Sequence, residues 1–76
     1  MSEVCKRIKK VRKSLELTQK EFCEPLGISR SHLSGIEIER EEPSTTLLLL
    51  IYEIYLKDYG FSKDWLLYGK DGKKDE

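Results

Sequence analysis

The sequence predicts an all-α domain built from five short helices. Apolar residues recur at helical spacing near the start of the chain, cap residues precede the later segments, and no stretch alternates apolar and polar residues as a half-buried strand does. With 76 residues the chain is near the size at which a single core only just suffices. We therefore expect one domain over residues 1–69, followed by a polar tail over residues 70–76.

The first helix is expected from Glu3 to Leu15. Val4, Ile8, Val11 and Leu15 recur at helical intervals and lie on one face, while lysines and arginines fill the opposite face. The first twenty residues carry seven basic side chains against two acidic ones, although the whole chain balances 14 basic with 14 acidic residues. The total charge therefore indicates no partner, but its distribution leaves one strongly positive region.

A second, short helix is expected to begin after Thr18. Thr18 and Glu21 have the spacing of a capping box, in which each side chain bonds the backbone of the other residue. Phe22 and Leu26 are its expected core residues, and Gly27 can take the left-handed conformation that ends helices.

A third helix follows after only about four residues. Ser29 is its expected N-cap, and Leu33 and Ile36 form its inward face. Helices this short are marginal in water, so each must be pressed against the other and against the core. The outer face is free of core contacts and consists of polar or small residues: Arg30, Ser31, His32, Ser34 and Gly35. A face of this kind is what a protein inserts into a DNA major groove.

Two more helices complete the expected fold. Ser44 caps a fourth helix that runs to about Lys57, and Ser62 caps a short fifth helix that Gly69 ends. Nine of the ten residues of Leu47–Leu56 are apolar, which is more than one core-facing stripe can use. Either the fifth helix covers the second side of this segment or a second copy of the chain does.

Several classes of protein are excluded by what the sequence lacks. Cys5 and Cys23 have no metal-site spacing and are expected to be reduced, and His32 is the only histidine, so we expect no metal, no cofactor and no enzymatic site. No small-molecule ligand is evident. No secretion signal opens the chain and the Leu-rich run is too short to span a bilayer, which predicts a cytoplasmic protein without membrane contact.

Four segments together resemble the helix-turn-helix domains of phage-repressor and Cro type, the XRE-like regulators of bacteria and phages. They are RIKKVRKSLELTQKEF, LGISRSHLSGIE, the dipeptide PS and GFSKDWLLYG, which fall in family order over about residues 7–69. The resemblance implies the lambda-repressor-like five-helix bundle, with helices two and three as the helix-turn-helix. It also implies sequence-specific binding of double-stranded DNA by a homodimeric repressor on a palindromic operator. A repressor-like protein-interaction module with weak or lost DNA binding is the alternative.

The resemblance assigns roles to individual residues. Those expected at base edges are Arg30, Ser31, His32, Ser34 and Gly35, although Gly35 offers no side chain where relatives usually place a reader. Those expected at phosphates are Thr18, Gln19, Lys20, Ser29 and Arg40. Arg30 is the best reader, because arginine can bond guanine O6 and N7 together, unless it is simply a solvated arginine. Arg12 and Glu37 are expected to form an ion pair that ties helix one to the recognition helix.

The chain also departs from the family pattern. The segment IEREE, residues 38–42, replaces an asparagine or glycine and basic residues, and its three acids would weaken docking on DNA unless they point away. The segment LKDY makes the fourth helix about one turn longer, which should preserve the facing of the fifth helix. Four tyrosines are either lining a dimer interface or at the rim of a small core: Tyr52, Tyr55, Tyr59 and Tyr68.

Overall fold

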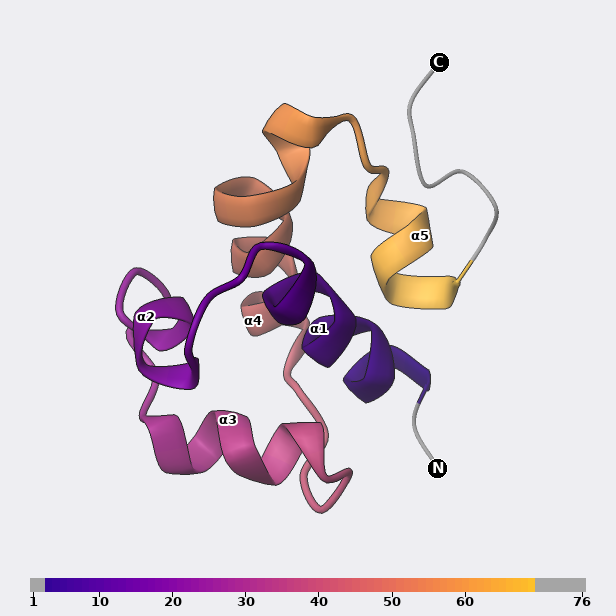
Figure 1. Cartoon of the computed structure of the whole chain (residues 1–76). Coiled ribbons are helices and arrows are strands. Elements are labelled where there is room, and N and C mark those ends of the chain that lie inside the picture. Colours follow the sequence, from indigo (N-terminus) through magenta and orange to yellow (C-terminus); the bar gives the residue numbers. More distant parts are fainter. Residues whose placement is uncertain (1–2, 70–76) are drawn as a thin grey trace.

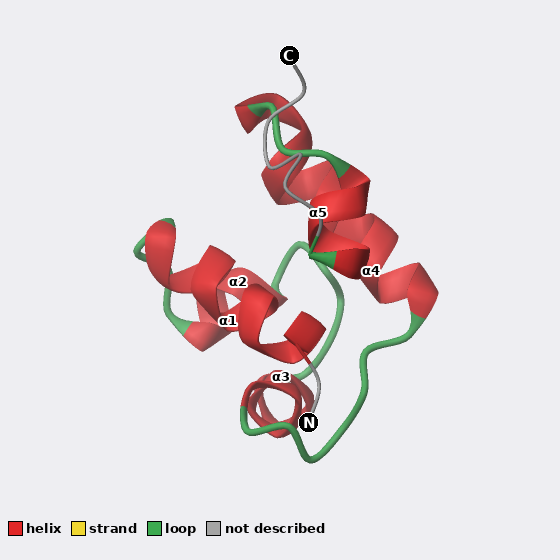
Figure 2. Ribbon diagram, turned by 90° about the vertical axis from the view of Figure 1, so that its right-hand side faces the viewer, coloured by secondary structure: helices red, strands yellow, loops and turns green. Residues whose placement is uncertain are grey.

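The computed structural model describes residues 3–69, and the regular structure within that range is entirely helical (Figures 1 and 2). The expected all-α architecture of five α-helices is thereby confirmed for the described residues, while the expected tail over residues 70–76 lies outside them. The elements in chain order are α1 (Glu3–Ser14), α2 (Gln19–Cys23), α3 (Arg30–Glu37), α4 (Thr45–Ile51), the π-helical turn η1 (Tyr52–Leu56), the 3-10 turn η2 (Lys57–Tyr59) and α5 (Lys63–Tyr68).

The helices are arranged around α1. Both views place α3 at one end of the molecule and the segment that follows α4 at the other end, with α1 between them (Figures 1 and 2). Helix α2 packs against α3, and α5 packs against α1 and α4. Helix α3 and the irregular segment after α4 are therefore on opposite sides of α1.

One apolar core joins all five α-helices. Helix α1 contributes Ile8 and Val11 as the sequence predicts, whereas Val4 and Leu15 are only half-buried. The side chains that are almost completely inaccessible to solvent come from every other helix as well and include Phe22, Leu33, Ile36, Ile51 and Leu66. Burial of this apolar surface is the main force that stabilises helices too short to persist alone.

The predicted helix starts are confirmed. Thr18 forms the complete capping box, because its Oγ1 accepts from the Glu21 amide at 3.0 Å and its own amide donates to Glu21 Oε1 at 2.8 Å. The hydroxyls of Ser29, Ser44 and Ser62 each accept the amide three residues further on, at 3.0 to 3.1 Å. Each bond satisfies an amide that has no partner within its own helix.

Glutamate, rather than glycine, holds the left-handed position after α1. Glu16 has φ 59°, its amide donates to the Lys13 carbonyl at 3.0 Å, and the Leu17 amide donates to the Arg12 carbonyl at 3.2 Å. These two bonds form a Schellman motif, in which glycine is the usual residue because it has no Cβ. Gly27, with φ 72°, takes the same conformation after α2, as the sequence predicts.

The expectation of a regular fourth helix to Lys57 is wrong. Regular α-helix ends at Ile51, and the chain continues as the π turn η1 and the 3-10 turn η2 up to Gly60, which has φ 80°. One wide π turn and one tight 3-10 turn therefore carry the chain from the end of α4 to Gly60. Tyr55 holds η1 to α2, since its ring stacks on Phe22 with centroids 4.4 Å apart.

Both thiols are buried and neither is in a disulfide. The Cys5 thiol donates to the Glu41 carbonyl at 3.4 Å, and the Cys23 thiol donates to the Ser29 carbonyl at 3.5 Å. Burial, with a smaller contribution from the charge of Glu37, raises the pKa of the Cys23 thiol. None of the helices in the described part of the chain has the length and apolar content needed to cross a bilayer.

Candidate nucleic-acid interface

Helix α3 presents a polar side to solvent. Leu33 and Ile36 are fully buried on its inward side, and Arg30 and Ser31 are exposed at its beginning. Ser34 is half-buried on the same helix. The exposed start of α3 thus offers a guanidinium and a hydroxyl, which are groups that bond base edges and phosphates.

A buried carboxylate fixes the other end of α3. Glu37 is paired with Arg12 of α1 by two parallel bonds, from Nε to Oε2 at 2.6 Å and from Nη2 to Oε1 at 3.0 Å. The side chain of Glu37 is only 3% exposed and that of Arg12 only 13%. The bonds to Glu37 raise the pKa of Arg12 above its already high value, although burial opposes that shift.

The same carboxylate also holds α2. Gln19 Nε2 donates to Glu37 Oε1 at 3.1 Å, and Arg12 Nη1 donates to the Leu17 carbonyl, just before α2, at 2.8 Å. Three helices therefore converge on the Glu37 side chain. Because an amide nitrogen carries two hydrogens, Gln19 keeps one with which to contact a phosphate.

The other residues expected at phosphates lie on the surface. Lys20 and Arg40 are both exposed, and the hydroxyls of Thr18 and Ser29 act as acceptors within their caps. A capping hydroxyl still has its own hydrogen to donate. Each of these side chains therefore keeps a hydrogen-bond donor in the described structure.

An acidic side chain from the loop after α3 lies on the recognition helix. Glu41 Oε1 and His32 Nδ1 are 2.6 Å apart, and a carboxylate can only accept, so the imidazole donates. Gly35 is buried beneath the same side chain, because a Cβ at that position would be 2.6 Å from Glu41 Oε2. The expected exposure of Gly35 is therefore wrong, and Glu41 does not point away from α3.

Backbone geometry brings Glu41 to this position. Glu39 is left-handed with φ 65°, and its amide donates to the Ile36 carbonyl at 2.9 Å. The amides of Arg40 and Glu41 both donate to the Gly35 carbonyl, at 2.8 and 3.2 Å. This second Schellman motif puts a glutamate in the left-handed conformation, which asparagine and glycine tolerate better.

Arg7 has a structural role that the sequence did not indicate. Its position on the basic side of α1 predicts a solvated side chain, but Nε donates to the Leu66 carbonyl at 2.9 Å and Nη2 to the Leu67 carbonyl at 3.3 Å. These carbonyls belong to the last turn of α5, where a cation is favoured. Arg7 therefore attaches α5 to α1.

The four tyrosines do not form one surface. Tyr55 faces inward, its hydroxyl donates to the Phe22 carbonyl at 2.8 Å, and burial raises its pKa, so it belongs to the core rim. Tyr52 is half-buried with the Lys63 ammonium 5.4 Å above its ring. Tyr59 and Tyr68 are the exposed pair, at 60% and 68%.

Helix α5 does not cover the whole apolar segment of α4 and η1. Leu49, Leu50 and Ile54 each remain about two-fifths exposed, at 40%, 39% and 39%. The sequence left two explanations open for this segment, cover by α5 or cover by a second copy of the chain. The exposure of these three residues shows that cover by α5 is incomplete. An apolar strip remains on this side of the described structure.

Comparisons with known proteins agree with this geometry. A family model described as a helix-turn-helix domain matches residues 5–72. The chain is 31% identical over 51 residues to the uncharacterized HTH-type transcriptional regulator YobD of Bacillus subtilis strain 168, an alignment that covers 67% of this chain. It spans 46%, about half, of that relative's length. No solved structure matches the chain significantly. The chain belongs to the helix-turn-helix domain family, in its XRE-like, phage-repressor-type form.

Proposed function

We propose that this protein is a sequence-specific regulator that binds double-stranded DNA through α3 and represses transcription in the cytoplasm. The observation that carries the proposal is the attachment of α3 to α1 and α2 through the Glu37 carboxylate, which leaves Arg30 and Ser31 exposed at the helix start. A helix held at its far end and exposed at its beginning suits insertion into a major groove.

Each contact has a chemical role in this proposal. Arg30 bonds guanine through its guanidinium, and Ser31 and Ser34 contact neighbouring base edges. The contacts to phosphates that hold the domain in register come from Thr18, Gln19, Lys20, Ser29 and Arg40. His32 contributes through its second ring nitrogen, because Nδ1 already bonds Glu41.

A homodimer on a palindromic operator completes the proposal. Two copies related by a two-fold axis place their recognition helices about one turn of DNA apart. The apolar strip of Leu49, Leu50 and Ile54 and the exposed rings of Tyr59 and Tyr68 support an interface in the carboxyl-terminal half. Tyr55 is not part of it, since its hydroxyl bonds within the domain.

A protein-interaction module is the second candidate function, and Glu41 is the observation that favours it. Its carboxylate lies against His32 and Gly35, on the helix that would approach DNA phosphates. A negative charge there opposes docking on a polyanion. The same feature would suit a protein partner with a basic surface.

Selection of bound sequences from a random duplex library, followed by titration at several salt concentrations, tests the proposal. We expect an enriched palindrome, and Arg30→Ala should weaken its binding by roughly 5- to 150-fold, the equivalent of about 1 to 3 kcal/mol. Lys57→Ala, an exposed change in η2, is the control and should bind normally. Equally weak binding of every duplex would contradict DNA recognition.

The variant Glu41→Gln distinguishes the two candidates. Removal of this negative charge should tighten operator binding about fivefold, corresponding to roughly 1 kcal/mol. Glu53→Gln, an exposed change in η1, serves as the charge-matched control. If Glu41→Gln leaves every duplex equally weakly bound, the interaction module becomes the better account.

A further inference from the structure

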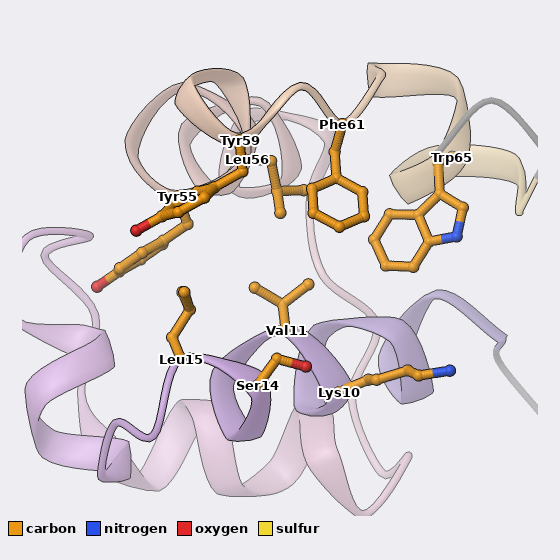
Figure 3. Close-up of a pocket in the computed structure, with 9 residues that line it drawn as sticks. All are labelled: Lys10, Val11, Ser14, Leu15, Tyr55, Leu56, Tyr59, Phe61 and Trp65. Atoms are coloured by element: carbon orange, nitrogen blue, oxygen red, sulfur yellow. The ribbon is translucent and has the colours of Figure 1, made fainter. Parts of the chain in front are cut away.

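A groove lies on the side of α1 that faces away from α3 (Figure 3). It has a volume of about 520 Å³, within the range of small-molecule sites in proteins. One wall is α1, and the other is formed by η1, η2 and the beginning of α5. None of the residues assigned above to DNA contacts lines it.

The α1 wall is apolar at its base and polar at its edge. Val11 is 5% exposed and Leu15 is half-buried, whereas Lys10 and Ser14 are exposed. These four residues share the face of α1 that begins with Arg7, whose bonds to the α5 carbonyls fix the distance between the two walls at one end. The groove opens along α1 beyond that attachment.

The opposite wall is largely aromatic. Phe61 and Trp65 are half-buried with ring centroids 5.2 Å apart, and Leu56 lies between them and Tyr55 (Figure 3). The wide π turn followed by the tight 3-10 turn gives Tyr55, Leu56 and Tyr59 their positions in this wall. Departures of this kind from regular α-helix are frequent at functional sites.

The described lining of the groove carries positive charge and no negative charge. Lys10 supplies an ammonium, and no carboxylate is among the described residues that line it. Figure 3 shows the Lys10 side chain running toward the end at which the Trp65 indole lies. An ammonium and an indole N–H are both donors only, so this end complements an anion, while the remaining wall complements an apolar body.

We propose that the groove binds an amphipathic small molecule with one carboxylate and an apolar body. The carboxylate pairs with Lys10, and the body lies between Val11 and Leu15 on one side and the rings of Phe61 and Trp65 on the other. A carboxylate is preferred to a neutral ligand because the charge on the described lining is positive. This site goes beyond the proposed function: it shares Tyr59 with the proposed dimer interface, but none of the residues proposed to contact DNA lines it.

Decanoate is a suitable probe, and 1-decanol is its uncharged counterpart, both kept below the concentrations at which they aggregate. Trp65 is the only tryptophan, so its fluorescence reports the groove directly. We expect saturable binding of decanoate to the full chain and weaker binding of decanol. Lys10→Met should weaken decanoate about fivefold and leave decanol unchanged. The control Lys9→Met removes the neighbouring exposed charge, which is outside the groove, and should bind decanoate normally.

A second variant tests the location. Ser14→Phe fills the groove from the exposed edge of α1 and should abolish decanoate binding, with circular dichroism checking that the fold is kept. No saturable change at Trp65, or equal affinities for decanoate and decanol, would overturn the proposal. So would sedimentation that shows a dimer dissociated by Ser14→Phe, because a second copy of the chain would then occupy the groove. Failure to enrich an operator leaves this result unaffected, which separates the two proposals.

Discussion

The amino-terminal half of the molecule is held by directed polar bonds, whereas the carboxyl-terminal half is held mainly by apolar contact. Between α1 and α3, the Glu37 carboxylate accepts three bonds from two other helices. From α4 to α5, the structure has a strip of partly exposed leucines and isoleucine, a π turn, and the aromatic wall of the groove whose other wall is α1. The first half fixes the orientation of a helix, and the second leaves surface for something else to bind.

Among the tests of this comparison, removal of the Glu37 carboxylate should have the largest effect on stability. Glu37→Ala leaves the guanidinium of Arg12, whose side chain is only 13% exposed, without its carboxylate, so we expect a loss of about 3 to 5 kcal/mol in the free energy of unfolding. Urea denaturation measures it. Glu53→Ala is the control, because its pair with Lys57 is 3.5 Å long and more than half exposed, and it should cost less than about 1 kcal/mol. Equal effects would remove the distinction between the halves.

Arg7 is the main polar attachment of the carboxyl-terminal half. Arg7→Met keeps an apolar stem but loses both bonds to the α5 carbonyls, for which we expect a cost of about 1.5 to 3 kcal/mol. Hydrogen exchange should rise in α5 before it rises in α3. Lys6→Met, which removes an exposed charge one residue earlier, should leave exchange in α5 as it is. Uniform acceleration throughout the chain would show that the two halves are not separable.

Tyr55 joins the two halves through its bond to the Phe22 carbonyl. Tyr55→Phe should cost about 0.5 to 1.5 kcal/mol at neutral pH, measured by thermal unfolding, with Tyr68→Phe as the exposed control.

The contribution of the Tyr55 hydroxyl also depends on pH. Its pKa is raised in the folded protein, so its contribution is fully present below the ordinary tyrosine pKa of about 10 and is lost as the pH rises through the folded value. Tyr55→Phe should therefore lose less stability than the unaltered protein above that pH. An identical alkaline loss in both proteins would contradict this.

We expect substitutions at the helix ends to have the smallest effect on stability. At these positions the amino-terminal half has the less favourable residues. Glu16 and Glu39 hold two of its left-handed positions, whereas Gly60 and Gly69 hold those of the carboxyl-terminal half. Glu16→Gly should stabilise the protein by about 0.5 to 1 kcal/mol, because it relieves a Cβ clash that outweighs the flexibility of glycine in the unfolded chain. Gly60→Ala should destabilise it. Chemical denaturation of both variants tests the sign.

The sequence by itself determined the features that depend on near neighbours. The caps at Thr18, Ser29, Ser44 and Ser62 involve residues three positions apart, and the inward faces follow from helical periodicity. The resemblance to a known family added the pairing of Arg12 with Glu37, which are 25 residues apart. The caps and the helix faces can be predicted from sequence because the geometry of one helical turn fixes which residues meet.

Only the tertiary structure decided where distant groups meet. Arg7 was indistinguishable from its basic neighbours until the α5 carbonyls, 59 residues away, were placed beside it. Glu41 covers Gly35 because the left-handed Glu39 turns the loop back, and the chain after α4 forms a π turn held by the stacking of Tyr55 on Phe22. In each case the position of the side chain depends on how the helices and turns pack against one another. A pattern of neighbouring residues does not predict that packing.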